Sequence, residues 1–433
     1  MAEPISSTFS GRTLPRLAGR DREQAVLRDR LSATLAGHGS LVLVGGEAGI
    51  GKTTLAEALC AEATSQGALV LVGHCYDLTE TPPYGPWAEA LAAVPRDAAS
   101  PPTPDLAGEN QATGREALFA AVRDYLAARS TDQALVLLLE DLHWADPASL
   151  DLLRAVARGV TGVPLLCVAT YRSDELTRRH PLYQLLPVLV REARATRLDV
   201  RPLDAASLRL LVRHYRLPER DEARLTGYLV ERAEGNPFFA GELLRTLEEE
   251  GALRPDGDAW HLGDLAAIGV PSLLRQVIDA RLDRLSGDGR VLLAAGAIVG
   301  QEVSLALWQV TSGADDETLA TVMEAAQAAH LLVPTADGAR FAHALIREAL
   351  YEGTLPLRRR AWHLRCAEAL LAAPAPDPDA VAHHLQRAGD PRAAEWLVRA
   401  GLRARGAVAW LTAAERFAGA AALLAGDASR ARG

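Results

Sequence analysis

A glycine-rich loop that contains one lysine is the clearest chemical signal in this sequence. Residues 46–53 read Gly-Glu-Ala-Gly-Ile-Gly-Lys-Thr, which matches GxxxxGK[ST], and they lie between an apolar strand-like run and an amphipathic stretch. Glycines at these positions let backbone N–H groups and a helix N-terminus surround a phosphate. We expect Lys52 to bridge the β- and γ-phosphates and the Thr53 hydroxyl to take a Mg²⁺ ion. The predicted nucleotide-binding residues of the loop are Gly46, Glu47, Ala48, Gly49, Ile50, Gly51, Lys52, Thr53 and Thr54.

The rarity of lysine supports this interpretation of the loop. The chain has 46 Lys plus Arg residues, and Lys52 is the only lysine among them. An ammonium is a compact point charge, whereas a guanidinium is a bulky planar fork, so some sites accept only lysine. The alternative, a plain glycine-rich turn between a strand and a helix, does not explain why this position kept its lysine.

Two acids follow a second apolar run. The run 135–139 is typical of a buried strand, and Glu140 and Asp141 come directly after it. A Mg-nucleotide site needs a carboxylate that holds the metal through water, and a second carboxylate can polarise the attacking water. We assign Glu140 to the metal and Asp141 to the water, both as candidate catalytic residues with Lys52. The alternative is two solvated acids at a strand end.

Two further polar residues lie at the same predicted edge of the sheet. Asp146 precedes Pro147, which is the pattern of a helix N-cap with proline at the first helical position, so a structural role is as good an interpretation as a functional one. Arg172 follows the run 165–169, at the carboxyl edge where open α/β folds bind ligands. We expect Arg172 to sense the γ-phosphate, with a surface salt bridge as its alternative.

Strands and helices alternate in the first part of the chain. Apolar runs at 41–44, 135–139 and 165–169, with weaker ones at 69–72 and 196–200, predict parallel strands. Helical spacing lies between them at 53–63, 115–128 and 148–156. This alternation predicts a three-layer α/β domain of the P-loop NTPase kind. The Pro- and Gly-rich segment 95–114 is expected to be a surface excursion or a disordered loop.

Helical periodicity dominates the rest of the chain. Three helices are expected at 205–213, 220–234 and 238–250, followed by helices at 272–285, 289–299, 305–311 and 316–329. The runs 331–334 and 340–342 flank an Asp-Gly turn and predict a hairpin, so that helices and hairpin together suggest a winged-helix domain. Helix pairs beyond residue 357 resemble the start of a helical repeat array, and we expect the sequence to stop inside a longer natural protein. The predicted domains are a tail (1–16), a P-loop ATPase domain (17–201), a small helical domain (202–265), a winged-helix domain (266–355) and a truncated TPR-like segment (356–433).

Composition limits the classes of partner. A length of 433 residues indicates two to four domains, and the net charge of −9 gives no general attraction for nucleic acid or an anionic membrane surface. The four cysteines are far apart in the chain, so we predict neither a zinc site nor a disulfide framework. The N-terminus lacks the apolar core of a signal peptide, and no apolar run is as long as a membrane span. We expect a cytoplasmic protein.

Motifs spread over most of the chain resemble those of one known class. In order they are Leu17-Ala18-Gly19-Arg20-Asp21-Arg22-Glu23, the phosphate loop, Tyr84-Gly85-Pro86-Trp87, the segments 137–146 and 169–172, Gly235-Asn236-Pro237-Phe238-Phe239, Phe341-Ala342-His343 and Ile346-Arg347-Glu348-Ala349-Leu350-Tyr351. Together they resemble the signal-transducing ATPases with numerous domains (the STAND class), specifically the AAA-type nucleotide module of the large ATP-binding LuxR-family regulators.

The resemblance implies roles for residues outside the phosphate loop. Gly19 and Arg20 would lie beside the adenine, Pro237 would pack on the base, and His343 would touch the β-phosphate of bound ADP. For His343 a core position is an equally good interpretation, and for Phe238 and Phe239 helix core is the better one.

Two departures from the family pattern stand out. Glu140 replaces the family's usual first Asp, which predicts slow or absent hydrolysis, and no LuxR-type DNA-binding domain is present, so DNA would be bound only through a domain absent from this chain.

The resemblance favours a regulatory switch. ADP would hold a closed form, while ATP and an inducer or protein partner on the helical repeats would favour an open, self-associating form, and slow ATP hydrolysis would reset it. The alternatives are an ATPase attached to another signalling output such as a cyclase or kinase, an origin-recognition-like DNA-binding ATPase, a turnover enzyme such as a P-loop kinase, and a scaffold whose nucleotide is structural.

Overall fold

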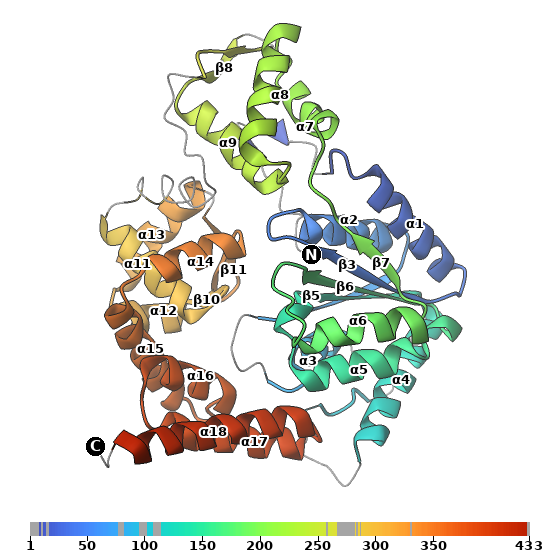
Figure 1. The fold of residues 1–433 in the computed structure, drawn as a ribbon, viewed down its shortest axis with the longest axis vertical. Coiled ribbons are helices and arrows are strands. Elements are labelled where there is room, and N and C mark those ends of the chain that lie inside the picture. Colours follow the sequence, from blue (N-terminus) through green and yellow to red (C-terminus); the bar gives the residue numbers. More distant parts are fainter. Residues whose placement is uncertain are drawn as a thin grey trace.

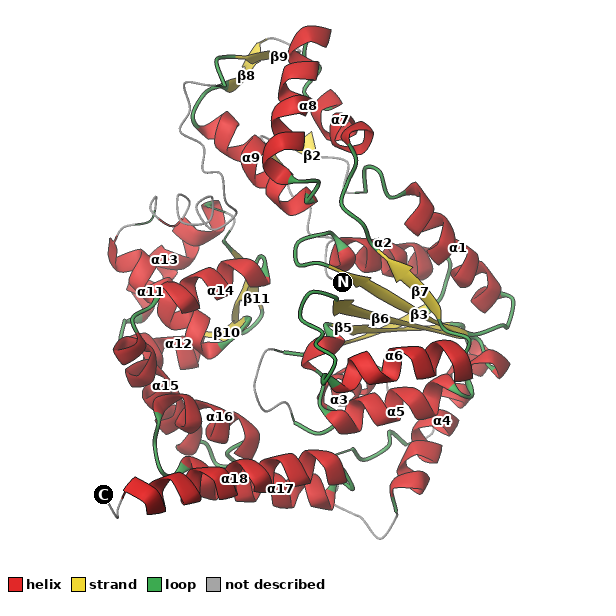
Figure 2. Ribbon diagram, viewed as in Figure 1, coloured by secondary structure: helices red, strands yellow, loops and turns green. Residues whose placement is uncertain are grey.

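The chain folds into four consecutive parts that follow one another around a ring (Figure 1). A computed structural model describes residues 8–9, 12–13, 17–76, 82–94, 102–106, 114–256, 259–265, 282, 285, 287–329 and 331–430. An α/β part comes first, then a helical part, then helices with a small antiparallel sheet, and then a run of helices that returns to the first part (Figure 2). Among the described residues no helix is both long and apolar enough to cross a membrane.

One parallel sheet of five strands forms the centre of the first part. All five predicted strands are confirmed, and their order in the sheet is β4-β5-β6-β3-β7. The phosphate loop follows β3, and the two acids lie at the end of β5, so the central strands bring both to the same edge. The strands are β3 (Ser40–Gly46), β4 (Leu69–His74), β5 (Leu135–Glu140), β6 (Leu165–Arg172) and β7 (Thr196–Asp199).

Alternate strand residues face two different helical layers. Leu41 and Leu43 belong to the core beneath α3 to α6, whereas Val42 and Val44 belong to the core beneath α1 and α2. Because successive strand side chains point to opposite faces, a continuous apolar run is what a sheet covered on both sides requires. The predicted three-layer α/β architecture is therefore confirmed (Figure 1). The helices are α1 (Asp21–Leu35) and α2 (Lys52–Ser65) on one face, and α3 (Gly85–Ala92), α4 (Arg115–Asp132), α5 (Pro147–Ala157) and α6 (Pro181–Glu192) on the other.

Several smaller elements complete this part. Two short 3₁₀ helices, Leu142–Trp144 and Val160–Gly162, flank α5, and a two-residue strand pair, β1 (Thr8–Phe9) with β2 (Arg12–Thr13), precedes the domain. Most of the expected excursion 95–114 lies outside the described residues. Within it, Leu106 is described and packs into the core beneath α3 to α6.

Asp146 is a helix N-cap, as the Asp-Pro pattern predicted. Its Oδ1 accepts hydrogen bonds from the backbone N–H groups of Ala148 (2.9 Å) and Ser149 (3.1 Å) at the start of α5. Its Oδ2 accepts from the Ser149 hydroxyl at 2.5 Å, and Thr412 donates to Oδ1 at 3.3 Å from the far end of the chain. The carboxyl group therefore joins α5 to the C-terminal helices.

Removing the charge of Asp146 is expected to stabilise the protein at alkaline pH. Burial raises the pKa of Asp146 from 3.8 to about 6, although the Ser149 hydrogen bonds oppose this shift. A carboxyl group whose pKa is raised on folding contributes stability that is complete below about pH 4 and is lost as the pH rises through about 6. Asparagine caps helices as well as aspartate does. The free energy of unfolding of Asp146→Asn should therefore exceed that of the wild type by about 1–3 kcal/mol near pH 8, and by less near pH 5. Thermal unfolding at both pH values measures the difference. A variant equally destabilised at both pH values would contradict this.

The second part contains the three helices predicted after residue 202. Their apolar faces form one core, which includes Tyr215 and Phe239. The short hairpin that follows, β8 (Leu253–Asp256) with β9 (Ala259–Leu262), was not predicted because its strands carry polar residues and proline. The helices are α7 (Ala205–Arg213), α8 (Glu219–Ala233) and α9 (Pro237–Glu249).

The third part combines helices with a three-stranded antiparallel sheet of order β10-β12-β11. The predicted hairpin is confirmed as β11 (Leu332–Thr335) and β12 (Gly338–Phe341), and the third strand, β10 (Glu302–Ser304), was not predicted. Most of the helix expected at 272–285 lies outside the described residues. The helices are α11 (Gly287–Val299), α12 (Leu305–Ser312), α13 (Asp316–Ala328) and α14 (Ala344–Gly353).

Four helices form the last part and lead the chain back to the first. Ala404, Ala407, Ala409 and Ala413 belong to the same apolar core as the strands and helices beneath the parallel sheet. Figure 1 shows α17 and α18 running from the third part to the α/β part. The helices are α15 (Pro356–Leu371), α16 (Pro378–Ala388), α17 (Ala393–Gly406) and α18 (Trp410–Arg430).

Candidate functional site

The phosphate loop joins β3 to α2 in the geometry that its glycines predicted. Gly49 and Gly51 have φ angles of +76° and +98°, which residues with a side chain rarely adopt, and Gly51 is the N-cap residue of α2. The loop therefore places the amino end of α2 at the carboxyl edge of the sheet. This is the arrangement that binds anions in P-loop proteins.

The Lys52 side chain lies folded over this loop. Its Nζ donates to the carbonyl oxygens of Gly46 at 2.9 Å and Glu47 at 2.8 Å. Burial lowers the pKa of Lys52 to about 8, although the nearby Asp141 carboxylate favours the charged form. Two of its three donors thus contact neutral carbonyls, which leaves the ammonium well suited to exchange them for phosphate oxygens.

Glu140 is buried at the end of β5 and is held by a histidine from the neighbouring strand. The Nε2 atom of His74 lies 3.4 Å from Glu140 Oε2, and its Nδ1 lies 2.7 Å from Glu89 Oε1. Burial opposes the charge on His74, but hydrogen bonds to Glu140 and Glu89 outweigh it and raise the pKa of His74 to about 10. His74 is thus a cation that fixes one oxygen of Glu140. Sequence reasoning missed it, although its place at the end of β4 was a usable signal.

The other oxygen of Glu140 is suited to a metal site. Glu140 Oε1 is buried and has no hydrogen-bond partner among the described residues, which is costly for a carboxylate. The Thr53 side chain is exposed, and both residues line the same cavity. A hydroxyl and a carboxylate oxygen are ligands that Mg²⁺ accepts, usually with several waters. These residues therefore fit the ion that a nucleotide would bring.

Asp141 adopts a left-handed backbone conformation directly after the strand. Its φ is +56°, and its N–H donates to the Thr170 hydroxyl at 3.0 Å. Burial and the neighbouring Glu140 raise the pKa of Asp141 to about 6, while Arg172 and Lys52 oppose this shift. A carboxyl group that titrates near neutral pH suits a general base.

Arg172 is buried and connects two parts of the chain. Its Nη1 donates to Glu175 Oε1 at 2.5 Å and to Glu348 Oε1 on α14 at 2.9 Å. Its guanidinium also lies 4.8 Å from the ring centroid of Trp144. The structure thus places Arg172 at the carboxyl edge, as expected, and in an ion pair, which was its alternative. The partner Glu348 is 176 residues away in the sequence, although it belongs to a motif that carried the resemblance.

The N-terminal segment also contacts the phosphate loop. Arg20 is buried, and its guanidinium donates to the carbonyl oxygens of Ile50 at 2.8 Å and Arg201 at 2.6 Å. Gly19 has a φ of +70°, and a β-carbon there would lie 2.1 Å from Ser207 Oγ on α7. Gly19 therefore permits a close approach to the helical part, whereas Arg20 contacts the loop itself.

The start of α9 touches the phosphate loop directly. Asn236 caps α9 through Oδ1, and its Nδ2 donates to Ala48 O at 3.0 Å. The N–H of Phe238 donates to Gly49 O at 3.3 Å. Asn236 was quoted within a motif but was not assigned a role. Phe239 belongs to the core of the helical part, as expected. Phe238 instead lies in the cavity wall, so the prediction that both residues are core holds only for Phe239.

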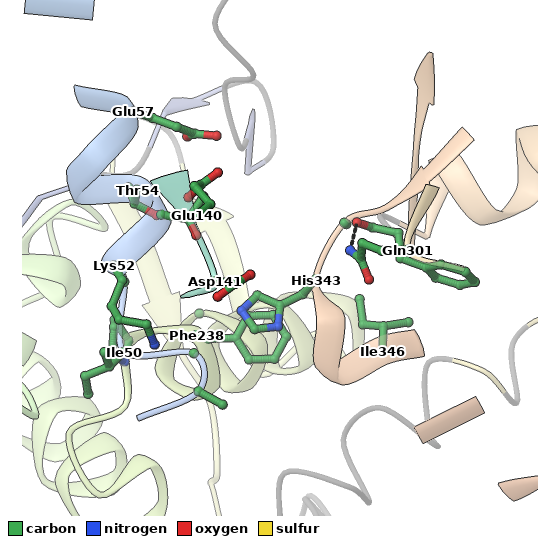
Figure 3. A pocket seen from close by; sticks show the side chains of 18 of the residues that line it. Ile50, Lys52, Thr54, Glu57, Glu140, Asp141, Phe238, Gln301, His343 and Ile346 are labelled. Atoms are coloured by element: carbon green, nitrogen blue, oxygen red, sulfur yellow. Dashed lines mark hydrogen bonds between the residues drawn. The ribbon is translucent and has the colours of Figure 1, made fainter. Parts of the chain in front are cut away.

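His343 reaches the site from the third part. It follows β12 and stacks on Phe238, with ring centroids 4.2 Å apart and an interplanar angle of 26°. Desolvation, with the positive charges of Arg172 and Lys52, lowers the pKa of His343 to about 3. Figure 3 shows its ring facing the space that Lys52 and Asp141 border. His343 is half-buried and lines the cavity.

A cavity of about 480 Å³ collects most of the predicted site residues. Its walls come from the α/β part, from α9 and from the β-sheet and α14 of the third part (Figure 3). Gly19, Gly46 and Glu47 do not line it, although the last two accept hydrogen bonds from Lys52. The predicted residues that do line it are Arg20, Ala48, Gly49, Ile50, Gly51, Lys52, Thr53, Thr54, Glu140, Asp141, Arg172, Pro237 and His343.

Known proteins are similar to this chain in sequence or in fold. Residues 16–168 match the family of AAA ATPase domains. An uncharacterized protein of Rhizobium meliloti (strain 1021) is 27% identical over 423 residues, which cover 86% of this chain and 39% of that protein. The crystal structure of a signal transduction ATPase with numerous domains (STAND) from Pyrococcus horikoshii, which has a tetratricopeptide repeat sensor, matches with a TM-score of 0.56.

Each of these matches covers part of the other protein. The STAND structure is 14% identical to this chain, and the match covers 97% of this chain and 58% of that one. At such identity the likeness concerns the fold. The chain spans 39% of the Rhizobium protein and 58% of the STAND structure. From the family match and the fold, we conclude that the chain carries an AAA-type P-loop ATPase module, which implies adenine nucleotide binding, in a fold similar to that of a STAND ATPase.

Proposed function

We propose that this chain is a molecular switch in which ADP holds a closed form and ATP favours an open one. The observation that carries the proposal is the cavity, which is bordered by three parts of the chain rather than by the ATPase part alone. A ligand shifts a conformational equilibrium only by its differential affinity for the two forms. A nucleotide that contacts several parts loses contacts when they separate, so its affinity for the closed and open forms differs.

Three contacts support a closed form across this cavity. Arg172 pairs with Glu348 at 2.9 Å, His343 stacks on Phe238, and Asn236 donates to Ala48 O in the phosphate loop. In this proposal the β-phosphate of ADP lies between Lys52 and His343. A γ-phosphate would bring its charge to Arg172 and compete with Glu348 for the guanidinium, which favours opening.

Hydrolysis would reset the switch. Thr53 and Glu140 would hold the Mg²⁺ ion, which neutralises phosphate charge, and Asp141 would accept the proton of the attacking water. Arg20 and Pro237, which both line the cavity, would form the adenine side of the site. His74 fixes Glu140 through one oxygen, so we expect the metal carboxylate to be positioned. Because Glu140 takes the place of the family's usual aspartate, we expect turnover to be slow.

The C-terminal helices offer a path for an inducer. Thr412 on α18 donates to Asp146 at the start of α5, close along the chain to the acids at the sheet edge. An inducer or protein partner that binds α15 to α18 would disturb this contact and so favour the open, self-associating form. In this proposal the third part is a winged-helix domain and the last a TPR-like segment. The chain would then serve a LuxR-family transcriptional regulator of the cytoplasm, in which another domain binds DNA.

Nucleotide content and basal turnover together test the switch. We expect purified protein to retain nearly one ADP per chain, measured by extraction and chromatography, and to hydrolyse ATP more slowly than about 1 per second, the lower end for ordinary enzymes. Asp141→Asn should abolish the residual turnover while ADP is retained. Protein that is isolated without nucleotide and hydrolyses ATP many times per second would indicate a turnover enzyme instead.

A further inference from the structure

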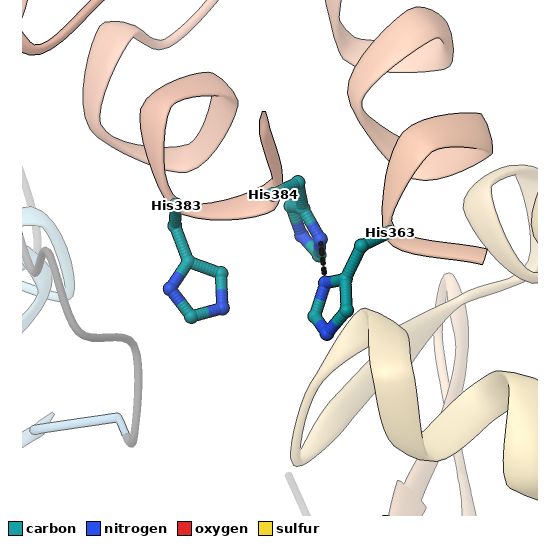
Figure 4. A group of neighbouring side chains, drawn as sticks. All are labelled: His363, His383 and His384. Atoms are coloured by element: carbon teal, nitrogen blue, oxygen red, sulfur yellow. Dashed lines mark hydrogen bonds between the residues drawn. The ribbon is translucent and has the colours of Figure 1, made fainter. Parts of the chain in front are cut away.

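Three buried histidines meet between α15 and α16, far from the phosphate loop in sequence. His363 lies on α15, and His383 and His384 lie on α16, with exposed fractions of 1%, 6% and 3%. One ring nitrogen of each lies within 4.8 Å of those of the other two. Figure 4 shows the three rings as neighbours, and their centroids lie 5.1–5.8 Å apart in a triangle.

Two of these rings turn the same kind of atom toward each other. The Nδ1 atoms of His363 and His384 are 2.9 Å apart. Their outer nitrogens also have partners: His363 Nε2 lies 3.1 Å from the Tyr351 hydroxyl, and His384 Nε2 lies 3.4 Å from Cys366 Sγ. Histidines that bind a metal usually use one ring nitrogen for the ion and donate the other N–H to a fixed acceptor. This pair has that arrangement.

The surroundings keep all three rings neutral. Burial and the neighbouring His384 lower the pKa of His363 to about 2, and burial lowers the pKa of His384 to about 4. The pKa of His383 is likewise well below its usual value because of burial and its two histidine neighbours. A neutral imidazole carries a free lone pair and is the form that binds metal ions.

Unlike His363 and His384, His383 has a ring nitrogen without a hydrogen-bond partner among the described residues. This atom is its Nδ1, which is buried. Figure 4 shows this Nδ1 on the side of the ring that faces away from His363 and His384, whereas Nε2 lies on the side that faces them. The three imidazoles in mutual contact can therefore offer an ion the Nδ1 atoms of His363 and His384 and the Nε2 atom of His383.

We propose that His363, His383 and His384 form a binding site for one divalent transition-metal ion that favours imidazole ligands, with Zn²⁺ as the preferred ion. His363 and His384 would bind it through Nδ1. The proton between the two Nδ1 atoms moves to an outer nitrogen, so both rings carry Nε2–H, and these donate to Tyr351 and Cys366. No proton has to leave the protein, because each ring keeps one N–H.

Such an ion would fix the first helix pair of the C-terminal part. It would connect α15 to α16, and through Tyr351 it would also restrain α14, the helix that carries Glu348. The cysteine spacing predicted no zinc site, and this candidate does not depend on a cysteine ligand. Its signal in the sequence is weak, because adjacent histidines in a helix are common on surfaces and only the fold places His363 beside them.

Zinc binding by the metal-free full chain tests the proposal. Chelator-treated protein is titrated with Zn²⁺ against a chromophoric chelator, in excess Mg²⁺ so that oxygen ligands near the phosphate loop are occupied. We expect wild type to bind one more Zn²⁺ per chain than His383→Gln, or to bind it more than about a hundredfold tighter, since loss of an outer partner alone costs about 10- to 100-fold. The control is His38→Gln, at an exposed histidine, which should match wild type. Equal Zn²⁺ stoichiometry and affinity in wild type and His383→Gln would overturn the proposal.

A second measurement does not depend on a variant that folds. Wild-type protein loaded with Co²⁺ should show the visible absorption of a low-symmetry nitrogen-ligated ion, and added Zn²⁺ should remove it in one equivalent. Zn²⁺ should also raise the thermal unfolding midpoint of wild type. A cobalt spectrum no different from that of the aqueous ion would show that these histidines are core residues only.

Discussion

Replacing Lys52 by alanine is expected to weaken binding of both Mg-ATP and Mg-ADP by at least about 10- to 150-fold. A hydrogen bond to a charged group contributes about 1.5–3 kcal/mol, and Lys52 would make at least one to the phosphates. Its Nζ already lies over the loop, 2.8–2.9 Å from two carbonyl oxygens, so no large rearrangement is needed to meet a ligand. Isothermal titration of nucleotide-free protein near neutral pH measures the effect.

Arg28→Ala is the matched control for the loss of a positive charge. Arg28 pairs with Glu62 at 2.8 Å on the outer side of α1 and α2, and its side chain is 55% exposed. Its removal should leave nucleotide affinity within about twofold of wild type, since exposed pairs contribute little. If Lys52→Ala binds nucleotides as wild type does, the phosphate loop is not the nucleotide site.

Glu348→Gln is expected to shift the preference of the chain from ADP toward ATP by about 5- to 30-fold. The pair with Arg172 is intermediate between exposed pairs, worth up to about 1 kcal/mol, and buried ones, whose disruption costs about 3–5 kcal/mol. Side-chain exposures of 6% for Arg172 and 31% for Glu348 place the effect near 1–2 kcal/mol. The ratio of dissociation constants for ADP and a non-hydrolysable ATP analogue measures it.

Glu175→Gln is the control that distinguishes loss of the contact between two parts of the chain from loss of a negative charge beside Arg172. Glu175 also accepts from Arg172 Nη1, but it lies in the same part of the chain, three residues away. Its neutralisation should change both affinities together and leave their ratio near that of wild type. Equal ratios in Glu348→Gln and wild type would mean that the Arg172–Glu348 pair does not bias the switch.

Local sequence patterns predicted the parallel sheet and most helices because the signals lie within single elements. The run at 135–139 is apolar on both faces, and a strand covered by helices on both sides requires that. The edge strand β10 carries a weaker pattern, since it is short and pairs on one side only. Helix α14 was not predicted, although it contains the motif at 346–351.

The candidate site was predictable where chemistry follows directly from spacing, and not where it depends on tertiary contacts. The glycines and Lys52 are enough by themselves to predict a phosphate loop. The partners of the two acids and of Arg172 come from other strands and helices: His74 from β4, and Glu348 from 176 residues further along the chain. The hydrophobic periodicity of the sequence does not indicate which residues from distant elements meet at the site. The same holds for Asn236, whose amide contacts the loop only because α9 begins there.

Hydrogen–deuterium exchange with and without Mg-ADP is the most direct test of the central claim that one nucleotide contacts both the phosphate loop and the third part of the chain. The account predicts that ADP slows exchange in the phosphate loop and also in the segment from His343 to the first turn of α14, and that Lys52→Ala shows neither effect. Protection confined to the loop, with unchanged exchange after β12, would show that the third part does not hold the nucleotide, and the proposed switch would be wrong.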